Sequence, residues 1–168
     1  MSRLGGCRAV ITGAASGIGE ATTRLFVGEG VAVVMADLDD DRGKRIVDEL
    51  GEQARFVHTD VSQEQDVEAA VAAAVDTFGG LDCLFNKAGH PGSVGGIEDV
   101  DTALFDRTLA MPLRGVFRGI RAAARVMRPQ GHGSIINTSS WPGWRRTSPW
   151  PGPQADNRAD TAHTESRN

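Results

Sequence analysis

The sequence predicts an α/β protein in which helices cover both faces of a doubly wound parallel sheet. The first observation is an apolar run at residues 9–11 that ends in a glycine-rich turn, which a helical pattern follows. The second is the alternation of short apolar segments with amphipathic ones, the order of parallel strands joined by right-handed crossover helices. The third is the uninterrupted apolar run at residues 31–36, which is typical of a strand buried on both faces.

Strands and helices alternate over the first part of the chain. The predicted strands lie at residues 7–12, 31–36 and 55–57, and the predicted helices begin near residues 18, 39 and 62. Apolar residues at three- and four-residue spacing mark the helices. Ser62 and Gln65 form a predicted capping box at the start of the third helix. Gly51 ends the second helix, and the pair Gly79-Gly80 ends the third.

The pattern continues with strands at residues 81–85 and 134–137 and a long helical pattern over residues 102–127. Pro112 lies inside the helical pattern. Because proline cannot donate a backbone hydrogen bond, we expect a kink there.

The composition changes at Trp141. All 3 tryptophans and four of the 7 prolines lie in residues 141–168, and no apolar period continues. We therefore divide the chain into a domain of residues 1–140 and an irregular tail of residues 141–168 that does not fold by itself. The abrupt change indicates a frameshift or a truncation. A C-terminally truncated sheet would expose the edge of its fifth strand.

Charge and composition exclude several functions. A net charge of −4 provides no basic field for nucleic acid or a membrane, and we expect the arginines at helical spacing in residues 114–128 to face solvent or a protein partner. We recognise no signal peptide and no run of about 18 apolar residues, and therefore expect a cytoplasmic protein. Cys7 and Cys83 fit reduced thiols, and no residue spacing predicts a metal site.

The glycine-rich turn runs from Thr12 to Gly19 with the spacing G-x-x-x-G-x-G. Glycines let the backbone turn sharply and approach a pyrophosphate, which then lies at the positive end of the following helix. In its strand–turn–helix context, this segment predicts a nucleotide site. The alternative is a glycine-rich turn without a ligand.

Residues 1 to about 140 resemble the N-terminal part of the short-chain dehydrogenase/reductase family. The resemblance rests on features in the family's order: the turn at 12–19, Asp37 after the second strand, Asp60-Val61, and the segments 86–89 and 133–140. It implies a Rossmann-type fold, a nicotinamide cofactor, and hydride transfer to or from a small-molecule alcohol or carbonyl. The cofactor-binding residues it implies are Gly13, Ser16, Gly17, Ile18, Gly19, Asp37, Leu38, Asp60, Val61, Asn86, Ala88 and Gly89.

Asp37 indicates which nicotinamide cofactor is preferred. A carboxylate at the end of the second strand can accept hydrogen bonds from both hydroxyls of the adenosine ribose. It would repel the 2′-phosphate of NADP, and neither Leu38 nor the acids after it could receive that phosphate, so we expect NAD to be preferred. The alternative is that Asp37 caps the following helix.

The resemblance also implies roles for two further segments. It implies that Asp60 approaches the adenine amino group while the Val61 backbone lines the same pocket. The alternative for Asp60 is an acid at a helix start. Asn86 corresponds to the first Asn of the family's N-N-A-G motif, which stabilises the central sheet and faces the cofactor. Lys87 replaces the second Asn, and we interpret it as a solvated loop charge.

The catalytic part of the family pattern is incomplete in this chain. In the family, a tyrosine acts as general acid/base, a lysine four residues later lowers its pKa, and a serine orients the substrate. Ser140 matches that serine, with Ser139 as the less favoured alternative. The chain contains no tyrosine, and its lysines, Lys44 and Lys87, lie far upstream. The family's helix Asn is also absent, because Pro112 and its neighbours occupy that region.

Three functions follow from these observations. The first is an NAD-dependent oxidoreductase by family whose catalysis is impaired in this chain. The second is an NAD-binding module without catalysis. The third is an interaction fragment that pairs with full-length relatives. A homo-oligomer formed through the helix of residues 102–127 is the expected protein partner, because the family commonly assembles through helices of this region.

Overall fold

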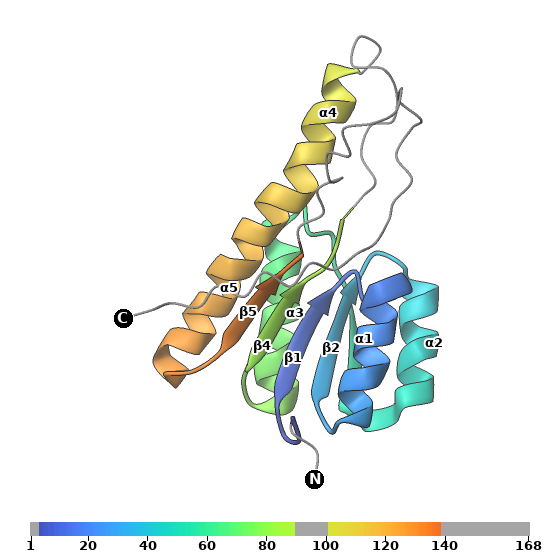
Figure 1. Cartoon of the computed structure of the whole chain (residues 1–168), viewed down its shortest axis with the longest axis vertical. Helices are drawn as coiled ribbons and strands as arrows, with labels where there is room; N and C mark the ends of the chain where they lie inside the picture. Colours follow the sequence, from blue (N-terminus) through green and yellow to red (C-terminus); the bar gives the residue numbers. More distant parts are fainter. Residues whose placement is uncertain (1–3, 90–100, 139–168) are drawn as a thin grey trace, which may run out of the picture.

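A computed structural model describes residues 4–89 and 101–138, which form a parallel sheet with helices on both faces (Figure 1). The strands are β1 (Arg8–Thr12), β2 (Ala32–Asp37), β3 (Ala54–His58), β4 (Cys83–Asn86) and β5 (Ser134–Asn137). The helices are α1 (Gly17–Gly28), α2 (Asp40–Leu50), α3 (Glu64–Phe78), α4 (Thr102–Leu109) and α5 (Gly115–Gln130). A 3-10 turn (Gly51–Gln53) follows α2, and a π-helical segment (Ala110–Arg114) joins α4 to α5.

The strand order is β3-β2-β1-β4-β5, and every neighbouring pair is parallel. The chain therefore runs outward from β1 to β3, crosses back, and continues outward on the other side through β4 and β5. The order reverses between β1 and β4, which is the topological switch point where open α/β sheets bind ligands. The prediction of a Rossmann-type, doubly wound parallel sheet is confirmed.

Each face of the sheet has its own apolar core. Val10, Val34 and Leu84 pack with α3 and α5, whereas Ala9, Ile11 and Met35 pack with α1 and α2. Successive residues of a strand thus contribute to opposite cores, as the pleat requires. Burial on both faces explains why residues 31–36 are apolar without alternation.

The predicted long helix is divided by a π-helical segment that contains Pro112. A π-helical turn accommodates the missing backbone donor by a local change in helical pitch. As a result α4 and α5 form one rod, which projects past the carboxyl ends of the strands without a sharp kink (Figure 1). Helix α5 continues to Gln130, and Gly131 ends it in the left-handed conformation with φ of 78°.

The predicted capping box of α3 is wrong. The helix begins at Glu64, its N-cap is Gln63, and no side chain caps it. The preceding turn is held by two carboxylates instead: Asp60 Oδ1 accepts a hydrogen bond from the Ser62 N–H, and Asp66 Oδ2 accepts one from the Asp60 N–H. Local spacing alone could not indicate this competition between acceptors.

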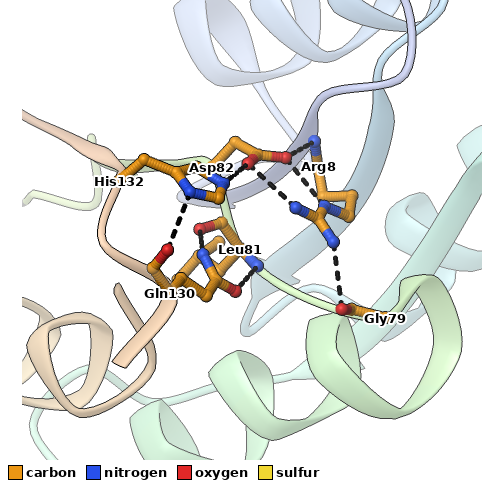
Figure 2. A network of polar contacts seen from close by, with 6 residues as sticks. All are labelled: Arg8, Gly79, Leu81, Asp82, Gln130 and His132. Atoms are coloured by element: carbon orange, nitrogen blue, oxygen red, sulfur yellow. Dashed lines mark hydrogen bonds and ion pairs between the residues drawn. The ribbon is translucent and has the colours of Figure 1, made fainter. Parts of the chain in front are cut away.

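A polar network joins the amino-terminal ends of β1 and β4 to the end of α5 (Figure 2). The Arg8 guanidinium donates to both carboxylate oxygens of Asp82, at 2.7 and 2.9 Å, and to the Gly79 carbonyl at 2.9 Å. The His132 ring contacts the same carboxylate at 3.0 Å. The Gln130 amide bridges the N–H and the carbonyl of Leu81. This network links the strands at their amino-terminal ends, which lie at the opposite end of the sheet from their carboxyl ends.

Candidate dinucleotide-binding site

The loops singled out by the sequence meet at one edge of the sheet. Because all strands are parallel, their carboxyl ends lie together, and the loops after β1, β2, β3 and β4 are brought to the same edge. The glycine-rich turn follows β1 and lies at the switch point beside β4. The parallel sheet predicted from the sequence implies this shared edge, whereas the loops that become neighbours there depend on the strand order.

The glycine-rich turn is packed too closely to admit side chains at two positions. Gly13 has a φ of 68°, and a Cβ there would lie 2.9 Å from the Cα of Ala88. A Cβ on Gly19 would overlap the carbonyl group of Gly13. Gly17 has a φ of 51° and open space around it. The turn thus combines a tight interior with an accessible outer surface.

The amino terminus of α1 is exposed and lacks a side-chain cap. Ser16 is its N-cap and makes no capping hydrogen bond, and Ser16, Gly17 and Ile18 are exposed. The first N–H groups of a helix have no partner within the helix. An uncapped, exposed terminus of this kind can bind an anionic group through its N–H groups and the helix dipole.

Asp37 lies at the end of β2 and is half-buried. Its Oδ2 accepts a hydrogen bond from the Ala15 N–H in the glycine-rich turn at 2.8 Å, and its Oδ1 accepts one from the Asp39 N–H at 3.1 Å. The alternative that Asp37 caps α2 is wrong, because Asp39 is the N-cap and accepts from the Arg42 N–H. The neighbouring Leu38 is 54% exposed. Asp37 is therefore attached to the glycine-rich turn.

Asp60 and Val61 occupy the loop after β3. The Asp60 carboxylate accepts a hydrogen bond from the Ser62 N–H at 2.8 Å. It therefore has a local role in the turn before α3, which is close to the alternative of an acid at a helix start. Val61 is buried, and a Cβ on Gly115 of α5 would lie 3.2 Å from it. The loop is thus packed against the amino end of α5.

Asn86 links β4 to β5. It is 5% exposed, and its Nδ2 donates to the Asn137 Oδ1 at 2.9 Å across the β4–β5 pair. The following N–H groups of Lys87 and Ala88 both donate to the Thr12 Oγ1 at 3.0 Å. These bonds hold the segment up to the exposed Gly89 against the glycine-rich turn.

A small cleft lies at the switch point. It is lined by Thr12, Val61, Asn86, Ala88, Gly115 and Val116. Sequence reasoning did not assign Thr12 a role within the site, nor Gly115 and Val116. The two α5 residues contribute because small residues let the helix approach the sheet: a Cβ on Gly119 would overlap the Asn86 side chain. The four-residue spacing of Gly115 and Gly119 was the sequence feature that could have indicated this close approach.

The arginines of α5 are not all free to face solvent or a partner. Arg118 donates to the Val61 carbonyl at 3.3 Å, while Arg121 and Arg125 form ion pairs with Glu64 and Glu68 of α3. The arginine series therefore connects α5 to α3 and to the loop after β3.

Ser139, Ser140 and the tail of residues 141–168 lie outside the described residues. Lys44 is exposed on α2 and pairs with Asp40 at 3.2 Å. Lys87 is half-buried at the site itself.

The two cysteines are free thiols. Burial raises the pKa of Cys83 to about 11, so its thiol stays protonated near neutral pH. Within residues 4–89 and 101–138, no cluster of three or more His, Cys, Asp or Glu side chains is suited to a metal ion. None of the helices described there has the length and apolar character needed to cross a bilayer.

The strand order and the glycine-rich turn at the switch point define a Rossmann-type domain. The profile of the short chain dehydrogenase family matches residues 8–151. The chain belongs to this family, which is a family of oxidoreductases.

Several known proteins are similar to the chain. Momilactone A synthase of Oryza sativa subsp. japonica is 50% identical over 140 residues, which cover 82% of this chain and 51% of the relative. The mitochondrial borneol dehydrogenase of Lavandula x intermedia is 48% identical over 141 residues, 83% of this chain and 54% of the relative. A 3-alpha-(or 20-beta)-hydroxysteroid dehydrogenase of Mycobacterium tuberculosis (strain ATCC 25618 / H37Rv) is 46% identical over 138 residues, 82% of this chain and 53% of the relative.

A solved structure is also similar. The 3-ketoacyl-(acyl-carrier-protein) reductase from Brucella melitensis, complexed with NADH, superposes with a TM-score of 0.73 at 38% identity. The match covers 76% of this chain and 53% of that one. The chain spans about half the length of the curated relatives it matches.

Proposed function

We propose that the chain binds NAD(H) in preference to NADP(H), as the nucleotide-binding part of an alcohol or carbonyl oxidoreductase, and that it does not turn over such substrates by itself. The observation that carries the proposal is the attachment of the Asp37 carboxylate to the glycine-rich turn, beside the uncapped terminus of α1. The NADH bound to the Brucella reductase supports it.

The residues of the site fit a dinucleotide. Gly13 and Gly19 let the turn close tightly on itself, whereas the space around Gly17 is open to the cofactor. The α1 terminus at Ser16–Ile18 would bind the pyrophosphate. Asp37 would accept hydrogen bonds from the adenosine ribose, with Leu38, Asp60 and Val61 beside the adenine. Asn86, Ala88 and Gly89 would flank the nicotinamide half. When bound, NAD supplies a hydride acceptor and NADH a hydride donor.

Turnover is not expected because the proton-transfer machinery is missing. The chain contains no tyrosine, and loss of a general acid/base typically lowers the rate by ~10²–10⁴-fold. Ser140 could orient a substrate oxygen but cannot replace a proton donor. An alcohol or carbonyl substrate is therefore inferred for this chain only from its family.

Titration calorimetry with NADH and NADPH tests the cofactor proposal. We expect NADH to bind more tightly, and Asp37→Asn to weaken NADH binding roughly tenfold, because a hydrogen bond to a charged group is worth about 1–1.5 kcal/mol more than one to a neutral group. Asp39→Asn, a nearby acid that caps α2 instead, is the matched control and should change NADH affinity little. Equal NADH and NADPH affinities, or NAD reduction by the same preparation with secondary alcohols, would contradict the proposal.

A second function, self-association, is favoured by a specific surface. Leu113, Phe117 and Ile120 follow one another at helical spacing and are 70%, 60% and 38% exposed. The other faces of α5 are occupied by the sheet and by α3. An exposed apolar line of this kind typically marks a protein interface, and we propose a second copy of this chain as its partner.

Phe117→Glu is expected to weaken self-association by at least roughly tenfold, since it removes about 1.5–3 kcal/mol of apolar burial and adds a charge. Sedimentation velocity over a concentration series measures this. Leu25→Glu is the matched control, because Leu25 is 63% exposed on α1. A wild-type chain that stays monomeric up to about 100 μM would contradict the proposal. The standard free energy of dimerisation would then be less favourable than about −5.5 kcal/mol.

A further inference from the structure

Lys87 is held at the switch point by its backbone. Its N–H donates to the Thr12 Oγ1 at 3.0 Å, and the next N–H, of Ala88, donates to the same oxygen. Gly13 is in turn packed against Ala88. The start of the Lys87 side chain is therefore fixed beside the glycine-rich turn.

The alternation of β4 indicates the side of the sheet on which Lys87 lies. Leu84 belongs to the core formed with α3 and α5, and Asn86 packs under Gly119 of α5. Phe85 packs on the opposite core, with α1 and α2. Lys87 is the first residue after β4 (Cys83–Asn86). Continuing the same alternation by one position would direct its side chain to the face of the sheet that α1 covers.

The segments that form the site contain more acidic than basic side chains. Of the segments 12–19, 37–39, 60–61 and 86–89, three contribute no basic residue, and Lys87 is the basic residue of the fourth. Asp37 and Asp60 are acidic, whereas the α1 terminus supplies only about half a positive charge. No described residue forms a hydrogen bond or an ion pair with the Lys87 ammonium, and the residue as a whole is half-buried.

We propose that the Lys87 ammonium binds the pyrophosphate of the dinucleotide, adding a full positive charge where the family motif carries a neutral amide. The inference rests on the proposed function. A pyrophosphate is dianionic and would otherwise be bound only by the backbone N–H groups and the partial positive charge of the α1 terminus. An ammonium donates to phosphate oxygens as a point charge, with less geometric demand than a guanidinium.

Lysine acetylation of the native chain tests the contact directly. The chain contains Lys44 and Lys87 and no other lysine, so Lys44, exposed on α2, is an internal control. We expect saturating NADH to slow acetylation of Lys87 roughly fivefold or more, as expected when a charged hydrogen bond protects the amine, and to leave Lys44 unchanged. Inorganic pyrophosphate should protect Lys87, and adenosine should not. Protection by adenosine alone would overturn the assignment to the pyrophosphate.

The variants Lys87→Asn and Lys44→Asn test the contribution to affinity. Lys87→Asn restores the family residue and should raise the Kd for NADH roughly 5- to 20-fold at low salt, with a smaller difference at high salt because mobile ions screen the attraction. Lys44→Asn should leave the Kd unchanged, and both variants should melt near the wild-type temperature.

The outcomes separate this inference from the proposed function. A wild-type chain that does not bind NADH refutes the proposed function and the inference with it. A chain that binds NADH while Lys87 reacts equally fast with and without the cofactor, and while Lys87→Asn keeps full affinity, overturns the inference alone.

Discussion

Replacing Gly19 with alanine is expected to abolish NADH binding and to lower the free energy of unfolding by about 3 kcal/mol, the upper range for overpacking. The added Cβ would overlap the Gly13 carbonyl group, which cannot move aside as a flexible side chain could. Gly13 itself is fixed, because its N–H donates to the Ala36 carbonyl at 2.8 Å and its Cα region packs against Ala88. Relief of the clash must therefore displace the turn that is proposed to hold the cofactor.

Thermal melts and NADH titrations measure this effect. A loss of about 3 kcal/mol corresponds to a decrease in Tm of roughly 6–12 °C for a chain of this size. Gly28→Ala is the matched control in the last turn of the same helix, since a Cβ there meets nothing within 4 Å. It should leave stability unchanged or increase it by up to about 1 kcal/mol through helix propensity. A Gly19→Ala chain with wild-type Tm and NADH affinity would show the expectation to be wrong.

Removing the carboxylate of Asp82 is expected to have the second large effect. Hydrogen bonds from Arg8 lower the pKa of Asp82 to about 2 from its ordinary 3.8, and Asp82 in turn raises the pKa of Arg8. The carboxylate is 17% exposed and receives donors from Arg8 and His132 (Figure 2). The Asp82→Asn variant should lower the free energy of unfolding at pH 7 by about 1–2 kcal/mol, after allowance for solvent screening.

The pH dependence follows from the sign of this shift. Since the folded-state pKa of Asp82 lies below its unfolded value, its stabilisation is fully present above pH 3.8 and is lost as the pH falls towards about 2. Urea denaturation at pH 7, 5 and 3 should therefore show a difference between wild type and Asp82→Asn that shrinks at the lowest pH. Asp76→Asn, at an exposed position of α3, is the control. A difference that grows on acidification would contradict this account.

The sequence by itself determined the elements and the class of the fold. Continuous apolar runs predicted β1 and β2 to within one or two residues, because strands buried on both faces must be apolar throughout. Glycine stop signals predicted the ends of α2 and α3, where Gly51 and Gly79 have positive φ. The glycine-rich turn and Asp37 predicted the candidate site, since such a turn requires residues without side chains.

Only the tertiary structure decided how these elements meet. Periodicity reports which face of an element is buried but not which strand becomes its neighbour, so the switch point between β1 and β4 and the Asn86–Asn137 bond were not predicted. The division of the predicted long helix by a π-helical segment depended on how Pro112 is accommodated between α4 and α5. Gly115 and Gly119 became part of the site because α5 packs on the loop after β3 and on β4, and close approach is a property of the assembled fold rather than of any one segment.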